Sequence, residues 1–138
     1  MDNKNNVENT DTNFVDFQDQ VSQVLVRHRS ILDTMTKLNE FDSRISRSVI
    51  KSVTSCGCIS IDAQKQDFGS ESFENMINKA NNHVKGHICD NCKDVIEEEI
   101  GSYLFYLASL TNALDLDLST VLSKEYNRIK TLGIYSLK

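Results

Sequence analysis

The sequence predicts an all-α fold in which four main helices form a bundle, with a cysteine-bearing insertion between the second and the third. Two observations predict it. The 138 residues contain no proline, although about seven would be expected at the usual frequency of ~5%. Because proline interrupts helices and marks turns and strand edges, its absence favours a few long helices. Apolar residues also recur at steps of three and four, which is the spacing of one helix face.

The first 13 residues carry almost no apolar side chain, so we expect residues 1–13 to form a disordered tail and residues 14–138 a single all-α domain. A heptad seam then predicts one long helix from residue 14 to residue 38. The members of the seam are Phe14, Phe17, Val21, Val24, His28, Ile31, Met35 and Leu38.

A second helix is expected to begin at Asp42 or Ser43, since either side chain can cap it. The apolar stripe of this helix consists of Ile45, Val49 and Val53. It should end near Cys56, because the glycine that follows has the backbone freedom of a helix terminus. The insertion then covers about residues 56–92.

Within the insertion, we expect residues 59–69 to form a connector without regular structure. A short amphipathic helix is expected after Ser70, and its apolar face ends at Val84. The third main helix is expected after Cys92. Its inward-facing residues are Val95, Ile96, Ile100, Tyr103, Leu104, Leu107 and Leu110. The chain should turn at residues 114–117, where an aspartate caps a last helix through Ile129.

Charge and hydropathy exclude several classes of protein. The net charge of −5 and the pI near 5.1 argue against general affinity for nucleic-acid backbones. No apolar run approaches the ~18 residues of a membrane span, and the polar N-terminus has no signal-peptide pattern. We therefore expect a cytoplasmic protein without a membrane partner, in which cysteines favour metal binding or free thiols over disulfides.

The four cysteines form two close pairs, Cys56 with Cys58 and Cys89 with Cys92. Paired thiolates suit a tetrahedral zinc site of the structural kind, in which four protein ligands leave no open position. If the second and third main helices run antiparallel, the two pairs meet at neighbouring helix ends and a metal clamps them. Reduced thiols without metal and a redox-active pair remain alternatives, and His83 or His87 is near enough in sequence to replace one ligand.

Charged residues form two further groups. Asp94, Glu97, Glu98 and Glu99 crowd the start of the third main helix. Asp94 shares a helix face with Glu97 or Glu98 and could hold a divalent cation with it; the alternative is that acids simply complement the helix dipole there. On the second helix, Arg44, Arg47 and Lys51 share one face, which is either a solvated surface or a binding site for phosphate.

The segments from Glu98 to Ala108 and from Asn112 to Leu118 resemble the third helix and following turn of the MazG-like nucleotide pyrophosphohydrolases. Lys124, Asn127 and Arg128 resemble the lysine, asparagine and arginine positions with which that family contacts phosphate. The resemblance implies an all-α fold, a homodimer, and cleavage of nucleoside triphosphates to monophosphate and pyrophosphate. It also implies Mg²⁺ held by an E-x-x-E motif on the second helix and an E-x-x-D motif on the third.

The chain departs from both acidic motifs. The E-x-x-D position ends in Ser102 in place of an acid, and the segment that corresponds to E-x-x-E, residues 43–49, contains no acid. Arginines there place positive charge where Mg²⁺ should lie. The first hypothesis is therefore a MazG-like protein with a degenerate metal site and a structural zinc clamp, which binds a nucleotide or another phosphorylated molecule or has a regulatory role.

Two other hypotheses stay open. The first is an active nucleoside triphosphate pyrophosphohydrolase whose Mg²⁺ ligands are rearranged and drawn from four carboxylates, with Glu98 and Glu99 as the catalytic residues and Asp94 and Glu97 as possible Mg²⁺ ligands. The second is a helical interaction module, in which the seam of residues 14–38 and the cysteine clamp hold a protein partner.

Overall fold

The computed structural model describes residues 12–69 and 72–136. This part of the chain is mostly helical, which confirms the all-α prediction in its broad form. The elements in chain order are α1 (Phe14–Val24), α2 (Ile31–Lys51), the π-helix η1 (Ser52–Cys56), β1 (Ile59–Ile61), α3 (Phe73–Lys79), β2 (Val84–Gly86), α4 (Asp90–Ala113), α5 (Leu118–Leu132) and the 3₁₀ turn η2 (Gly133–Ser136). Residues 1–11 of the expected tail lie outside the described residues. No described helix is both long and apolar enough to cross a bilayer.

The predicted helix over residues 14–38 is wrong, because the chain breaks between α1 and α2. His28 adopts a left-handed conformation with φ of 56°, and the guanidinium of Arg29 donates to the carbonyl oxygens of Leu25 and Ser22 at 2.7 Å each. These bonds satisfy acceptors that the end of a helix leaves unpaired. The heptad spacing continues across the break, and residues 25–30 contain neither glycine nor proline. The sequence pattern therefore gave no sign of the turn.

The helix expected to begin at Asp42 or Ser43 instead starts at Ile31 and runs through both residues. The hydroxyl of Ser43 donates to the carbonyl oxygen of Asn39 within the same helix. Without a strong breaker near residue 42, the helix extends along α4, and its packing against a neighbouring helix favours a continuous element.

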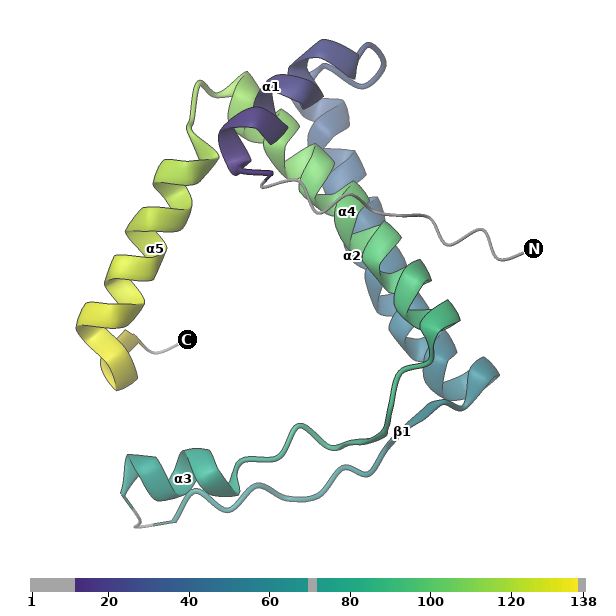
Figure 1. The fold of residues 1–138 in the computed structure, drawn as a ribbon, viewed down its shortest axis with the longest axis vertical. Helices are drawn as coiled ribbons and strands as arrows, with labels where there is room; N and C mark the ends of the chain where they lie inside the picture. The colour runs from purple at the N-terminus through teal and green to yellow at the C-terminus, as the bar shows by residue number, and fades with distance from the viewer. Residues whose placement is uncertain (1–11, 70–71, 137–138) are drawn as a thin grey trace.

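The α2 and α4 helices form an antiparallel hairpin, which is the principal helix pair of the molecule (Figure 1). Small polar residues bring the two backbones close near one end. Thr34 is fully buried, and its hydroxyl lies 3.1 Å from the hydroxyl of Ser109. Hydrogen bonding compensates the cost of burying these hydroxyls, so the hairpin has a defined register.

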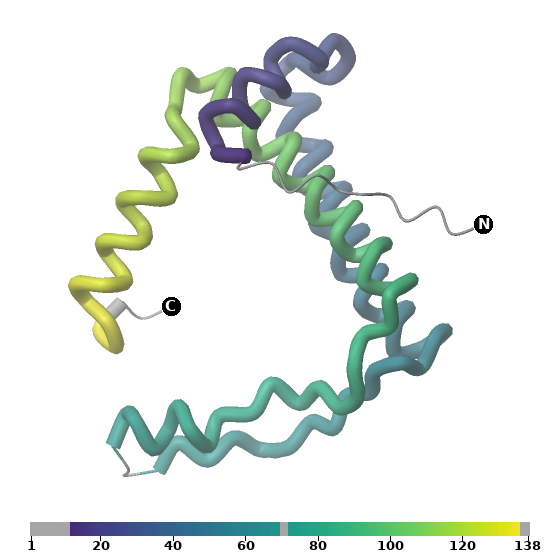
Figure 2. The backbone as a smooth tube through the Cα atoms, viewed as in Figure 1, coloured from purple at the N-terminus to yellow at the C-terminus, as the bar shows by residue number. Residues whose placement is uncertain are grey.

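The insertion is an arm that projects from the far end of this hairpin, as the teal segment of Figure 2 shows. β1 and β2 pair antiparallel at its base, with Ile59 opposite Gly86. Val84, expected on the amphipathic helix, therefore lies in a strand, and β1 replaces the start of the expected connector. α3 is capped by Ser72 and ends at Lys79. Ser70, which was expected to precede this helix, lies outside the described residues.

A small core joins α1 to the other end of the hairpin. Val21, Ala108 and Leu118 form its buried centre. Gln18 fastens the turn between α4 and α5, because its side-chain nitrogen lies 3.0 Å from the Thr111 hydroxyl and its oxygen accepts from the backbone nitrogen of Leu118 at 2.8 Å. Residues 114–117 form the predicted turn, and the predicted cap of α5 is confirmed by a bond from the Ser119 nitrogen to the Asp117 carboxylate.

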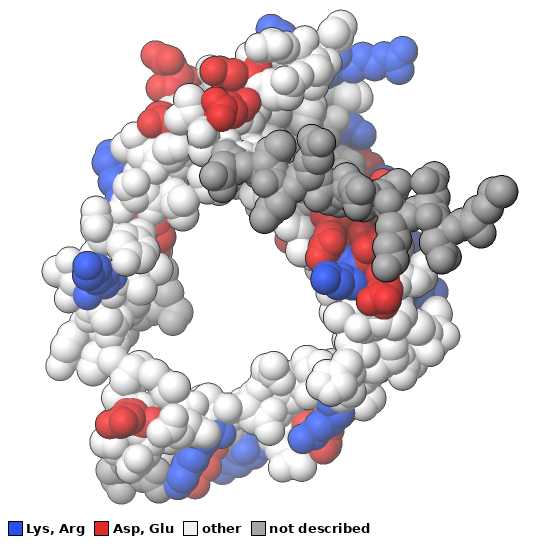
Figure 3. All heavy atoms as spheres, viewed as in Figure 1, with Lys and Arg blue, Asp and Glu red and all other residues white. Residues whose placement is uncertain are grey.

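α5 leaves this core and extends away from the α2/α4 hairpin (Figure 1). The hairpin, the arm and α5 make three sides of an open frame, and Figure 3 shows that side chains do not fill its centre. Within one chain, α5 therefore does not complete a compact bundle with α2 and α4.

Candidate metal centre and adjoining pocket

The first cysteine pair lies at a turn where α2 passes into the arm. The last turn of this helix is a π-helix that ends at Cys56, and such turns are frequent at functional sites. Gly57 follows with φ of 75°, in the left-handed region that glycine adopts without strain. Gly86 packs against this turn so closely that a Cβ there would lie 2.7 Å from the Cys58 carbonyl oxygen.

The second cysteine pair lies at the start of α4. Cys89 is the N-cap residue, and its sulfur accepts from the backbone nitrogen of Cys92 at 3.5 Å. That hydrogen bond, with weaker contributions from the other thiols, lowers the pKa of the Cys89 thiol to about 7. Position 89 therefore favours a thiolate, which is the form that binds metal. The helix was expected to follow Cys92, but Cys92 lies in its first turn.

The antiparallel hairpin brings the two pairs together, as the sequence predicted. The four sulfurs of Cys56, Cys58, Cys89 and Cys92 all lie within 4.8 Å of one another. The Cys56 and Cys89 sulfurs are 3.8 Å apart. A tetrahedral ion with metal–sulfur bonds of about 2.3 Å would place neighbouring sulfurs about 3.8 Å apart. The cluster is therefore a candidate metal site whose dimensions need little adjustment.

The chemistry of the cluster also favours a cation at its centre. A hydrogen bond with Ser52 lowers the pKa of Cys92, but the neighbouring thiols and burial together raise it to about 12. Four thiols at this separation therefore resist complete ionisation unless a positive ion joins them. All four are free cysteines, and among the described residues neither His83 nor His87 belongs to the cluster.

A pocket of about 630 Å³ adjoins the cysteine cluster between α2 and α4. It contains the basic row that the sequence singled out, together with two of the four cysteines. Its lining residues are Glu40, Arg44, Arg47, Ser48, Lys51, Ser52, Ser55, Cys56, Asn91, Cys92, Val95 and Glu99. The sequence analysis assigned six of these lining residues to no site: Glu40, Ser48, Ser52, Ser55, Asn91 and Val95. The position of Asn91 between two cysteines was the available signal.

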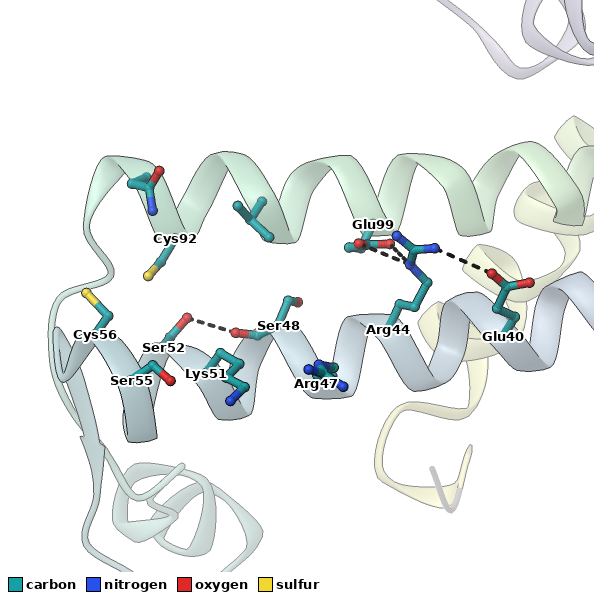
Figure 4. Close-up of a pocket in the computed structure, with 12 residues that line it drawn as sticks. Glu40, Arg44, Arg47, Ser48, Lys51, Ser52, Ser55, Cys56, Cys92 and Glu99 are labelled. Carbon is teal, nitrogen blue, oxygen red and sulfur yellow. Dashed lines mark hydrogen bonds and ion pairs between the residues drawn. The ribbon is translucent and has the colours of Figure 1, made fainter.

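Arg44 makes ion pairs with two carboxylates of the protein, those of Glu99 and Glu40. Its Nε lies 3.0 Å from a carboxylate oxygen of Glu99 on α4, and its Nη1 lies 3.4 Å from Glu40 (Figure 4). A 2.8 Å hydrogen bond from Lys37 lowers the pKa of Glu40 and keeps that carboxylate charged. Arg44 therefore bridges the two helices at one end of the pocket.

Arg47 and Lys51 are different, because neither makes an ion pair with another described residue. Figure 4 shows them on the α2 side of the pocket, whereas Arg44 reaches toward α4. The pocket contains the cations Arg44, Arg47 and Lys51 and the anions Glu40 and Glu99. Since both acids contact Arg44, the remaining positive charge belongs to Arg47 and Lys51.

The carboxylates at the start of α4 are dispersed. Glu99 pairs with Arg44, and Glu97 lies 3.7 Å from Lys93. Asp94 is exposed, and Glu98 faces a second pocket with aromatic residues such as Phe41 and Tyr106. Within residues 12–69 and 72–136, the cysteine quartet is the one group of three or more metal-ligating side chains that lies close enough to share an ion.

The phosphate-contacting positions implied by the resemblance lie on α5. Lys124, Asn127 and Arg128 do not line the pocket between α2 and α4, and Arg128 pairs with Glu125 at 2.6 Å. α5 occupies another side of the frame (Figure 1). Comparison of the chain with protein-family models, curated proteins and solved structures found no match.

Proposed function

We propose that this protein binds a phosphorylated small molecule, such as a nucleotide, in the pocket between α2 and α4, and that a structural zinc ion at the cysteine cluster holds one end of that pocket. The observation that carries the proposal is the pair Arg47 and Lys51, which line the pocket without an ion-pair partner among the described residues. Guanidinium and ammonium groups bind phosphate oxygens through charge-assisted hydrogen bonds. Ser55 and Asn91 line the same pocket and supply neutral donors.

Zinc is the proposed metal because four thiolates form its usual structural ligand set. Cys56 and Cys58 would hold it from the end of α2, and Cys89 and Cys92 from the start of α4. When bound, zinc joins these segments and contributes folding free energy. Because four protein ligands complete the coordination, the metal would have no position for substrate.

A non-catalytic role fits the state of the acidic residues. In the MazG-like resemblance, Glu99 is a ligand of Mg²⁺, yet its carboxylate lies 3.0 Å from the Arg44 guanidinium. A cation would have to displace that guanidinium, and the second helix offers no acid in residues 43–49. The chain is then a divergent MazG-like protein whose hydrolytic metal site has degenerated.

The test is calorimetric titration of the zinc-loaded chain with pyrophosphate and with nucleoside mono- and triphosphates, without Mg²⁺. Arg47→Ala combined with Lys51→Ala should weaken binding at least about tenfold, since each charged hydrogen bond contributes about 1.5 kcal/mol or more. The control, Arg27→Ala with Lys65→Ala, removes two positive charges outside the pocket lining and should leave affinity unchanged. Equal binding by both double variants would reject the site.

Arg47 and Lys51 have a second possible role, which is to neutralise the charge of the zinc–thiolate cluster, and measuring the zinc content of the double variant distinguishes it from phosphate binding. A zinc ion with four thiolates carries a net charge of −2, which Arg47 and Lys51 could neutralise. If that is their whole role, the double variant loses zinc and the wild type shows no anion binding. Release of pyrophosphate in the presence of Mg²⁺ that stops on Glu98→Gln would instead support the active hydrolase.

A further inference from the structure

A second pocket, of about 430 Å³, lies next to the first along the α2/α4 hairpin. Residues spaced by seven lie on one stripe of a helix, because seven residues make about two turns. On α4, Asn91 lines the first pocket, whereas Glu98 and Phe105 on the same stripe line the second. On α2, Ser48 lines the first pocket and Phe41 lines the second. The second pocket is therefore a continuation of the first on the same side of the hairpin.

The distance between the two pockets suits one ligand that occupies both. Along α2, six residues separate Phe41 in the second pocket from Arg47 in the first, since they are positions 41 and 47. Six residues of an α-helix correspond to about 9 Å. A nucleoside di- or triphosphate is long enough to place its phosphates beside Arg47 and Lys51 and its base in the second pocket.

Aromatic side chains form one wall of the second pocket, and contacts among them fix their positions. The rings of Phe41 and Tyr106 stack with their centres 5.5 Å apart, and Phe105 meets Tyr106 edge-on at 5.1 Å. The guanidinium of Arg44 lies 5.2 Å from the centre of the Phe41 ring. All three rings are partly exposed. Since every nucleobase has a flat face that stacks on aromatic rings, this wall suits a base.

Two polar side chains of the second pocket can select among the bases. Glu98 and Ser102 line it four residues apart on α4, which places them on one helix face. The Glu98 carboxylate makes no ion pair or hydrogen bond within residues 12–69 and 72–136. A carboxylate only accepts hydrogen bonds, whereas a serine hydroxyl also donates. The pocket therefore offers an unused acceptor with a donor beside it.

Guanine is the common base that matches this pair of groups. Its pairing edge presents an exocyclic amine and a ring N–H side by side, followed by a carbonyl oxygen. Adenine and cytosine place an acceptor next to their amine, and uracil has a carbonyl on each side of its N–H. A charged carboxylate repels those acceptors, so Glu98 favours guanine over the other bases.

We propose that the second pocket binds the base of a guanine nucleotide whose phosphates lie beside Arg47 and Lys51. Glu98 accepts from the exocyclic amine and the ring N–H of guanine, and the Ser102 hydroxyl donates to its carbonyl oxygen. The place of the phosphates rests on the proposed function, whereas the contacts with the base do not. Ser102 then has a role at the position where the resemblance implies an acid.

Calorimetric titration of the zinc-loaded full chain with guanosine, inosine and adenosine diphosphates, without Mg²⁺, tests the base site. Inosine differs from guanosine only in lacking the exocyclic amine. Guanosine diphosphate should therefore bind at least about tenfold more tightly than either of the others, because they lose a hydrogen bond to a charged group.

A matched pair of variants assigns the preference to this pocket. Glu98 is exposed, so Glu98→Gln should keep the helical circular dichroism of the wild type. It should remove the preference for guanine, since an amide replaces one acceptor oxygen with a donor, and it should not weaken the binding of pyrophosphate. Glu97→Gln should keep the preference, because Glu97 lies 3.7 Å from Lys93 and outside the pocket lining.

The outcomes separate the base site from the phosphate site. Binding of pyrophosphate that depends on Arg47 and Lys51, with equal affinity for the three diphosphates, would overturn the base site and leave the phosphate site standing. Binding of the nucleoside guanosine that is lost on Glu98→Gln would support the base site even if those cations bind no phosphate. A preference for guanine that survives Glu98→Gln would overturn the assignment to this pocket, and no binding of any compound would overturn both sites.

Discussion

The α2/α4 hairpin differs from the arm and from α5 in the contacts that stabilise it. Along the hairpin, polar residues meet in pairs: Thr34 with Ser109, Arg44 with Glu99, and at the far end the cysteines. On α5 and α3, large apolar side chains face solvent. The hairpin therefore contains its stabilising contacts within one chain, whereas α5 and the arm leave large apolar side chains exposed.

The difference shows that directional contacts, not apolar burial alone, define this fold. Few apolar residues are buried in the described part of the chain, and a small core contributes limited hydrophobic free energy. Hydrogen bonds between buried polar groups then account for a larger share of the stability of the hairpin, to which the proposed zinc ion would add. Variants that remove these contacts should therefore destabilise the hairpin.

The largest effect is expected at the cysteine cluster. Cys89→Ser with Cys92→Ser should abolish stoichiometric zinc and lower stability by about 4 kcal/mol, the stabilisation given by a ligand at 1,000 times its Kd. For a domain of this size that lowers Tm by more than about 10 °C. Zinc analysis and thermal unfolding by circular dichroism measure both quantities.

A chelator provides the control for that variant. It should lower the Tm of the wild type but leave the double variant unchanged, and it should act at lower concentration as the pH falls, because the thiol ligands must lose protons to bind metal. A wild type that is free of zinc and insensitive to chelator would show that the hairpin is stable with reduced thiols alone.

A smaller effect is expected where α1 fastens the start of α5. Gln18→Ala removes the amide that bonds to Thr111 and to the backbone of Leu118, and buried partners left unpaired cost about 2–3 kcal/mol. Gln20→Ala on the exposed side of α1 should change stability by less than about 0.5 kcal/mol. Urea unfolding compares the two, and equal losses would mean that Gln18 does not anchor the turn.

The smallest effect is expected inside the hairpin at Thr34. Thr34→Val keeps the shape of the side chain but leaves the Ser109 hydroxyl without its partner, at a cost of about 1–2 kcal/mol. Thr36→Val, on the exposed side of α2, provides the matched control in the same unfolding assay. If both variants unfold alike, the close approach of α2 and α4 rests on other contacts.

Much of the helical layout was readable in the sequence. The end of the second helix at Cys56 and Gly57, the turn at residues 114–117 and the cap at Asp117 were all predicted, because short-range backbone chemistry determines them. The break after α1 was not, since it depends on how Arg29 caps α1 and on α2 lying against α4. The strands of the arm were missed because three-residue segments carry too little periodicity.

The sequence by itself determined the groups on which the proposed function rests: two cysteine pairs, a basic row on one helix face, and no acid at Ser102 or in residues 43–49, where the resemblance implies one. These are properties of residue type and local spacing. Only the tertiary structure decided that the pairs meet within 4.8 Å, that Arg44 pairs with Glu99, and that Arg47 and Lys51 lie in one pocket beside the cluster. Such contacts depend on the register of two antiparallel helices whose residues are far apart in the chain, and no local pattern encodes that register.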